Sequence, residues 1–149
     1  MFAFNHAANE KMIEDTKGMD EQARSIQLIS HLINSQNKWL ARITVYPNDP
    51  HLDWWEPIYS YDQLAHELAK SNKAWADFLE KKSEEQLEEE VRFVGYDGGH
   101  WAARLQDIAL QLIFHSFHHR AQIQTLIRAE GKEPRFIDYI GDKYRKIPQ

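Results

Sequence analysis

Hydrophobic residues recur at intervals of three and four positions over most of the chain, which is the spacing of helices that bury one face. The first helix is predicted over about residues 4–16, with Gly18 at its end and Asp20 as the N-cap of the next helix. That second helix is long, because apolar residues keep the helical spacing over about residues 21–46. Pro47 then ends it.

Two Ser-x-x-Gln sequences mark further helix starts, because in this arrangement each of the two side chains satisfies a free backbone N–H of the first turn. Ser60 and Gln63 predict a third long helix, with a buried seam of large apolar residues that reaches Leu79. Ser83 and Gln86 predict one more helical turn after it.

The segment before the last long helix is predicted to be a strand and a turn. Apolar residues are frequent over residues 91–96, and an Asp-Gly pair follows, which indicates one arm of a small hairpin. The last long helix is predicted over about residues 101–128 and ends before Gly131. The tail after Pro134 is expected to pack back as a short helical cap.

These elements predict an all-α fold, a four-helix bundle with a short hairpin-like segment before the last long helix. We expect residues 1–149 to form a single helical-bundle domain. A chain of this length hides roughly 70% of the surface that its unfolded form exposes, so one core suffices. Sites in such bundles are built from side chains on facing helices.

Charge and composition narrow the function. The chain has 18 Lys and Arg against 23 Asp and Glu, a net charge of −5, which argues against nucleic acid as a partner. No stretch reaches the roughly 18 apolar residues of a membrane helix, and no targeting segment is recognised, so we expect a cytoplasmic protein without a membrane partner. The absence of cysteine removes thiolates of the protein from the candidate nucleophiles and metal ligands.

Polar residues interrupt the apolar seam of the last helix in one place. Steps of three and four residues lead along this seam: Trp101, Leu105, Ile108, Leu112, His115, His119, Gln122 and Leu126. His115 and His119 lie one turn apart on one face, the spacing that lets two imidazoles bind one metal ion. His118 falls about 100° round the helix, on its polar side. The spacing alone also fits two hydrogen-bonded histidines of the core.

A metal site needs another ligand from a second helix, and His31 is the best candidate. By periodicity it lies at the edge of the apolar face, near Leu28 and Ser35 but also near the polar Gln27. The spacing therefore leaves open whether His31 points inward or is a half-exposed surface histidine.

Other candidate sites fail on chemical grounds. His66-Glu67 begins like a zinc-protease motif, but Lys70 stands where the second histidine should be, and an ammonium group cannot bind a metal. Di-iron bundles need Glu-x-x-His, and the sequence contains no such tetrad. Trp54-Trp55 suggests a surface on which bases stack, but the acidic charge favours a loop cap over the bundle or a subunit contact.

The run His115-Ser-Phe-His-His-Arg120-Ala-Gln122 resembles the His-x-x-x-His-Arg-x-Gln signature in the last long helix of the DinB-like (DNA-damage-inducible) metal-binding superfamily. Further matches follow in order along the chain: Phe4-Asn5 with Ala8-Asn9, His31 with Asn34, Trp39 and Arg42, Trp75 with Phe78 and Leu79, and Gly131 with Pro134 and Asp138-Tyr139-Ile140. The sequence is therefore identified as a member of this superfamily. Arg120 is expected to be the partner in a structural ion pair.

The resemblance implies a four-helix bundle, commonly a homodimer, in which three histidines hold a divalent metal ion. These ligands are His31, His115 and His119 in this sequence, and zinc or nickel is the expected ion. Gln122 is a candidate to orient a ligating imidazole through a hydrogen bond. Asn9 either supports helix packing or faces the metal cavity.

Three neutral imidazoles leave a divalent ion with a free position, as in catalytic sites. Characterised branches of the family imply a low-molecular-weight thiol, such as bacillithiol or mycothiol, as cosubstrate. The predicted function is a metal-dependent thiol S-transferase or hydrolase that acts on a small electrophilic substrate. The alternative is a non-catalytic, stress-related metal-binding or interaction bundle. The general base stays open among His6, Glu10 and the tyrosines.

Overall fold

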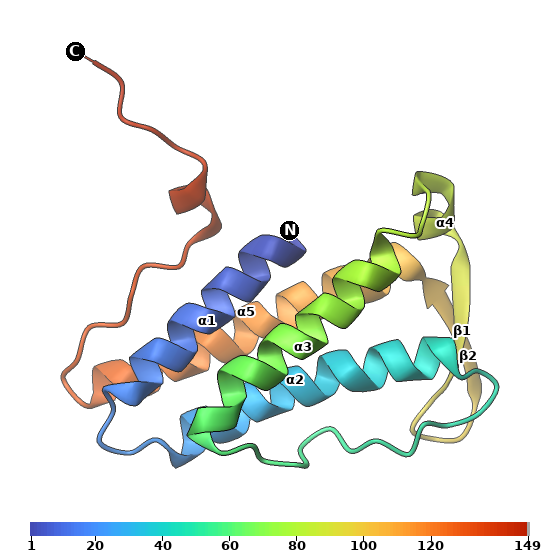
Figure 1. Cartoon of the computed structure of the whole chain (residues 1–149), viewed down its shortest axis with the longest axis horizontal. Coiled ribbons are helices and arrows are strands. Elements are labelled where there is room, and N and C mark those ends of the chain that lie inside the picture. The colour runs from blue at the N-terminus through green and yellow to red at the C-terminus, as the bar shows by residue number, and fades with distance from the viewer. Residues whose placement is uncertain (149) are drawn as a thin grey trace.

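The computed structural model describes residues 1–148 of the chain. Its elements are α1 (Phe2–Lys17), α2 (Ala23–Thr44), α3 (Tyr61–Leu79), α4 (Glu84–Glu88), β1 (Glu90–Val94), β2 (His100–Arg104), α5 (Leu105–Ala129) and the 3-10 helix η1 (Tyr139–Asp142). Figure 1 shows the four long helices α1, α2, α3 and α5 side by side, with the two strands at one end of the bundle. The predicted helical bundle, with a hairpin before its last long helix, is confirmed.

The long helices pack so that α1 and α2 each contact both α3 and α5. The contact between α2 and α5 joins the two helices that carry the predicted metal ligands. Each helix buries the face on which its apolar residues recur, so the packing follows from the periodicity of the sequence. In the part of the chain that the structure describes, no helix combines the length and the apolar character needed to cross a membrane.

Two apolar clusters fill the interior at different levels of the bundle. The larger cluster draws residues from all four long helices, among them Met12, Ile33, Leu64 and Ile123. The smaller cluster lies next to the hairpin and is built around Trp75, Leu105, Ile108 and Leu112. Along α5 the smaller cluster uses the first two turns and the larger cluster uses the last ones, so a gap separates the two levels.

Buried polar side chains occupy this gap, and we call them the polar layer. All four long helices contribute to it: Asn5, Asn9, His31, Ser35, Gln36, Ser71, Ser116, His119 and Arg120. Buried polar groups need hydrogen-bond partners, and part of the layer supplies its own. Ser71 donates to Gln36 Oε1 at 3.0 Å, and Asn5 Nδ2 donates to Ser116 Oγ at 3.2 Å.

The last long helix begins later than predicted. The segment that starts at His100 forms β2, which pairs antiparallel with β1 and places Trp101 opposite Phe93. Trp101 lies one helical turn before Leu105 in the sequence, so it matched the apolar seam by spacing alone. Its side chain is 54% exposed, and its indole N–H donates to Asp97 in the turn. The prediction of Trp101 as a helical seam residue is therefore wrong, because strand pairing competes with the helix here.

The start of the second helix also differs from the prediction. Asp20 does not cap α2, which begins at Ala23 after Gln22. Instead the carboxylate of Glu130, just after α5, accepts hydrogen bonds from the backbone N–H groups of Asp20 and Glu21, each at 2.9 Å. A side chain from the far end of the chain thus satisfies the backbone before α2, which no local pattern can show.

The tail after α5 packs back in part. Ile137 is buried in the larger apolar cluster, and Tyr139 packs edge-on against Phe4 with 5.1 Å between ring centroids. The element η1 supplies the predicted short helical piece. Phe136 and Ile140 stay largely exposed, so only one face of the tail covers the bundle.

We predict that Glu130→Gln lowers the melting temperature at pH 7 by a few degrees. Hydrogen bonds from the Glu21 N–H, Lys132 and the Asp20 N–H lower the pKa of Glu130 to about 2. Because this pKa lies below the ordinary value of 4.5, the stabilisation is present above pH 4.5 and is lost as the pH falls toward 2. Melting curves from pH 7 to pH 2 should show a smaller acid-induced loss in the variant. Glu133→Gln, at an exposed side chain, is the control, and equal effects of both variants would contradict the prediction.

Candidate metal centre

Three histidines from two helices face one point. His31 comes from α2, and His115 and His119 lie one turn apart on α5. The Nε2 atom of His115 lies 3.0 Å from Nε2 of His31 and 2.9 Å from Nε2 of His119. His31, whose orientation the helical spacing left open, is 7% exposed and points toward the other two rings. The structure thus brings the three predicted metal ligands together.

Hydrogen bonds to the second ring nitrogen orient two of these imidazoles. Nδ1 of His31 donates to the backbone carbonyl oxygen of Trp54 at 2.8 Å, and Nδ1 of His119 donates to Oε1 of Gln122 at 2.7 Å. A carbonyl oxygen only accepts, so in each neutral ring the proton sits on Nδ1 and the lone pair on Nε2. These Nε2 lone pairs face His115, which is the orientation a shared metal ion requires.

The surroundings keep all three imidazoles neutral. Burial lowers the pKa of His115 to about 4, and repulsion from the neighbouring imidazoles adds to this effect. Burial also lowers the pKa of His31 and of His119, and the hydrogen bonds that these rings donate to Trp54 and Gln122 oppose this effect. A metal ion binds the neutral form of imidazole, so at pH 7 these rings can bind a metal ion without first releasing a proton.

The donor atoms fit a divalent metal ion. One nitrogen from each ring lies within 4.8 Å of the others. Zinc–nitrogen bonds of about 2.0–2.1 Å in a tetrahedral arrangement place the nitrogens about 3.3 Å apart. The observed separations of 3.0 and 2.9 Å differ from this by a few tenths of an ångström, which side-chain adjustment can supply. Imidazole nitrogen suits zinc, nickel and copper, so the geometry does not select one of them.

The loop between α2 and α3 covers the histidines. The indole of Trp55 stacks on the His31 ring, with 3.8 Å between centroids and 11° between planes. The neighbouring Trp54 supplies the carbonyl oxygen that holds Nδ1 of His31. The expectation that the Trp54-Trp55 pair forms a loop cap over the bundle is therefore confirmed.

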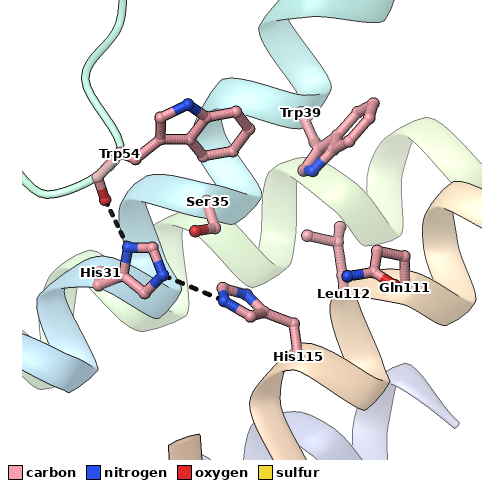
Figure 2. Close-up of a pocket in the computed structure, with 7 residues that line it drawn as sticks. All are labelled: His31, Ser35, Trp39, Trp54, Gln111, Leu112 and His115. Carbon is pink, nitrogen blue, oxygen red and sulfur yellow. Dashed lines mark hydrogen bonds between the residues drawn. The ribbon is translucent and has the colours of Figure 1, made fainter. Parts of the chain in front are cut away.

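A cavity of about 210 Å³ lies beside the histidines, between α2 and α5 (Figure 2). It is lined by His31, Ser35, Trp39, Trp54, Gln111, Leu112 and His115. Sites for drug-sized ligands have volumes of roughly 300–1,000 Å³, so this cavity suits a smaller molecule or one group of a larger one. Its walls combine imidazole, hydroxyl and amide groups with indole and aliphatic surface.

Gln122 contacts His119, one of the predicted metal ligands. It does not do so from the buried seam on which the spacing had placed it. Its side chain lies on the exposed side of α5, from which Oε1 reaches Nδ1 of His119. Its Nε2 lies 3.3 Å from Nε2 of His118, which is exposed as predicted. The buried stripe of α5 runs through Ser116, Arg120 and Ile123 instead, one position round the helix. Whether Gln122 tunes a metal ligand stays a prediction.

Arg120 has no carboxylate partner among the described residues, so its predicted ion pair is wrong. The side chain is 1% exposed, and Nη1 donates to Oδ1 of Asn5 and Oδ1 of Asn9, each at 2.7 Å. Its guanidinium also lies 4.5 Å from the ring centroid of Phe117. Burial lowers the pKa of Arg120 to about 10. Asn9 therefore supports the packing of α1 on α5 and does not line the cavity.

Several cavity residues were not identified as functional from the sequence. Ser35 and Trp39 follow His31 at successive steps of four on α2, and Leu112 precedes His115 by three on α5. This spacing could have indicated them, because residues three and four apart share a helix face. Gln111 gave no such signal, since its side chain approaches the cavity from the polar side of α5.

A comparison with models of protein families gives a match. The model of the DinB family matches residues 15–149. The match therefore includes α2 and α5 with all three histidines, whereas the start of α1, with Asn5 and Asn9, precedes it. A search of curated proteins found no match.

We predict that Gln122→Ala weakens divalent metal binding by about 10-fold, because loss of a hydrogen-bonded partner typically costs a ligating histidine 10–100-fold in affinity. The measurement is a competition titration of zinc against a chromophoric chelator. Gln124→Ala is the matched control, because Gln124 Nε2 donates to the Arg135 carbonyl oxygen and does not contact the histidines. An unchanged zinc affinity in Gln122→Ala would show that the hydrogen bond does not support the site.

Proposed function

The chain belongs to the DinB family, and from this membership and the three-histidine cluster we propose that it is a divalent-metal-dependent enzyme. The proposed reaction is transfer of a low-molecular-weight thiol to a small electrophilic molecule, or a related hydrolysis. The observation that carries the proposal is the convergence of three imidazole Nε2 atoms beside a cavity of about 210 Å³.

His31, His115 and His119 would hold the ion, with zinc or nickel as the proposed metal. When bound, a divalent ion supplies positive charge that favours the deprotonated form of a neighbouring thiol or water. The protein contributes pre-oriented neutral rings and a cover. Trp55 stacks on His31 and limits solvent access to that ring, which strengthens electrostatic interactions at the site.

Thiol transfer is favoured over hydrolysis by what lines the cavity. None of its lining residues in the described part of the chain carries a carboxylate that could act as a general base. His6 and Glu10 lie 3.3 Å apart on α1 and do not line the cavity. A thiol can release its proton to solvent, after which its sulfur forms a bond to the electrophilic carbon. The leaving group then departs with the electron pair of the broken bond.

The absence of a carboxylate from the described lining residues also favours a second candidate function, a non-catalytic metal-binding bundle. In that function the ion would stabilise the polar layer, and the cavity would have no reactive role. The two functions differ in a measurable way, because a metal that only stabilises changes the melting temperature and supports no turnover.

We predict that untagged protein binds about one zinc or nickel ion per chain, measured by elemental analysis. The metal-loaded protein should accelerate the reaction of a small thiol with a chromogenic aryl halide. His115→Ala should lose the ion and reduce this rate by about 100-fold or more, because two remaining imidazoles cannot complete the site. The rate is followed by absorbance under equal thiol concentration.

His66→Ala is the matched control, because His66 is an exposed histidine on α3 and should leave metal content and rate unchanged. Absence of turnover in metal-loaded protein, together with a lower melting temperature after chelation, would support the non-catalytic bundle. Less than a tenth of an equivalent of metal under metal-replete conditions would contradict both functions.

We also propose that the protein is a homodimer that pairs through the outer face of α5. Leu110 and Phe114 lie one turn apart on this face and are 38% and 60% exposed. Leu110 also lines a largely apolar groove of about 380 Å³ together with Phe2 and Leu87. A two-fold axis places the same patch of each copy against the other, and an uncharged patch can pair with itself without repulsion.

We predict that Phe114→Glu converts the dimer to a monomer, because two carboxylates would meet near the two-fold axis. Light scattering after size-exclusion chromatography measures the mass directly. Tyr96→Glu is the control, since Tyr96 is 98% exposed in the hairpin turn and is expected to leave the dimer intact. A monomeric wild-type protein at micromolar concentration would contradict the proposed interface.

A further inference from the structure

Ser35 has a hydroxyl group that faces the cavity and lacks a partner. The residue is one helical turn after His31 on α2, and its side chain is 2% exposed. Figure 2 shows it between the His31 ring and the two tryptophans, on the wall opposite His115. Its Oγ atom is buried and has no hydrogen-bond partner among the described residues.

Atoms of His6, Asn9 and Arg120 also lack partners, but these residues do not line the cavity, and Ser35 is the exception among the buried serines of the described chain. Ser30 Oγ accepts the backbone N–H of Tyr59 at 3.0 Å, and Ser71 Oγ donates to Gln36 at 3.0 Å. Ser116 accepts from an asparagine at 3.2 Å. A buried hydroxyl without a partner costs free energy, so an unpartnered one at a cavity wall indicates a ligand or water that supplies the partner.

The cavity has three levels along α2. Imidazole nitrogens of His31 and His115 lie at one level, the Ser35 hydroxyl one turn further, and the Trp39 indole one turn beyond that. Successive levels are about 6 Å apart along the helix axis, since four residues rise 1.5 Å each. Leu112 contributes aliphatic surface from α5. A ligand that fills the cavity therefore meets the histidines, then a hydroxyl, then apolar surface.

We propose that Ser35 is a specificity-determining residue, whose hydroxyl forms a hydrogen bond with an oxygen atom of a small ligand. One end of this ligand lies at the histidines, and an apolar part lies beyond Ser35. This deepens the proposed function, on which it rests, by naming the class of ligand: a hydroxyl, carbonyl or carboxylate compound of a few heavy atoms. Because a serine hydroxyl rotates and both donates and accepts, it can serve any of these groups.

Charge narrows this class further. No carboxylate lines the cavity within the described residues, and the guanidinium of Arg42 lies 4.7 Å and 5.5 Å from the ring centroids of Trp39 and Trp54. A cationic ligand would therefore find no counter-charge and a nearby positive group. Neutral and anionic ligands are favoured.

The test uses two thiols of equal length, 2-mercaptoethanol and propane-1-thiol, which differ only in a terminal hydroxyl or methyl group. Their dissociation constants from zinc-loaded protein are measured by calorimetry. The ratio of the two constants isolates the hydroxyl, since other contributions largely cancel. Ser35→Ala should weaken the binding of 2-mercaptoethanol relative to propane-1-thiol by about 3- to 10-fold, the range expected for one hydrogen bond.

Two further variants give the controls. Ser71→Ala removes another buried serine of the polar layer and should leave the ratio at the wild-type value. Ser35→Thr keeps the hydroxyl and should retain the preference. A ratio that is equal in wild type and Ser35→Ala overturns the proposal. Loss of the preference for 2-mercaptoethanol in both Ser35 variants also overturns it, because a change in packing would then explain the loss.

Failure of this proposal is distinguishable from failure of the proposed function. Zinc uptake and turnover with an unchanged ratio would refute the role of Ser35 alone. A protein without zinc uptake would refute the metal-dependent function. In that case the two thiols are titrated into metal-free protein, and their binding is followed by the NMR shifts of the backbone amides around Ser35. A preference for 2-mercaptoethanol that Ser35→Ala abolishes supports the proposal. Equal binding of the two thiols overturns it.

Discussion

The structure depends on how the polar layer is satisfied in the middle of an apolar bundle. Buried polar groups without partners cost about 1–3 kcal/mol each, so each pair that forms within such a layer stabilises the bundle. On the side of α1, Oδ1 of Asn5 and Oδ1 of Asn9 accept from Arg120, whereas Nδ2 of Asn9 and two guanidinium nitrogens of Arg120 have no partner among the described residues. Between α2 and α5, the histidines and Ser35 instead face a cavity. The layer therefore has a structural half and a half open to a ligand.

The histidines of the open half are held in place by groups that would not themselves bind a metal ion. The Trp54 carbonyl oxygen fixes the tautomer of His31 from the loop after α2, and Gln122 fixes that of His119 from the surface of α5. Trp55 stacks on the first of these rings. Rings that are locked in position and kept neutral by burial lose little freedom on binding an ion, which is the physical basis for reading them as a metal centre.

A site of this composition has imidazole donors and apolar walls but no carboxylate among its lining residues in the described part of the chain. In the proposed function the nucleophile would therefore come from a bound molecule. A chain without cysteine that provides a cavity beside three imidazoles is consistent with a borrowed thiol nucleophile. The size of the cavity, about 210 Å³, limits the part of a ligand that it can enclose to a few heavy atoms.

The sequence by itself determined the relations that local spacing controls. Periodicity predicted the long helices, and a four-residue step placed His115 and His119 on one face, because side chains one turn apart share a surface of the helix. The signature in this helix also predicted membership of the DinB family, which the family match bears out. The metal ligand set that the signature implies stays a prediction.

Only the tertiary structure decided the relations between elements. The rotation of α2 against α5 turned His31 inward. Groups distant in sequence replaced two predicted local interactions. The Glu130 side chain accepts from the backbone before α2 in place of the predicted Asp20 cap, and Asn5 accepts from Arg120 in place of the predicted ion pair. Strand pairing removed Trp101 from the helix. Spacing within one helix carries no information on how that helix is rotated against its neighbours, and long-range packing sets that rotation.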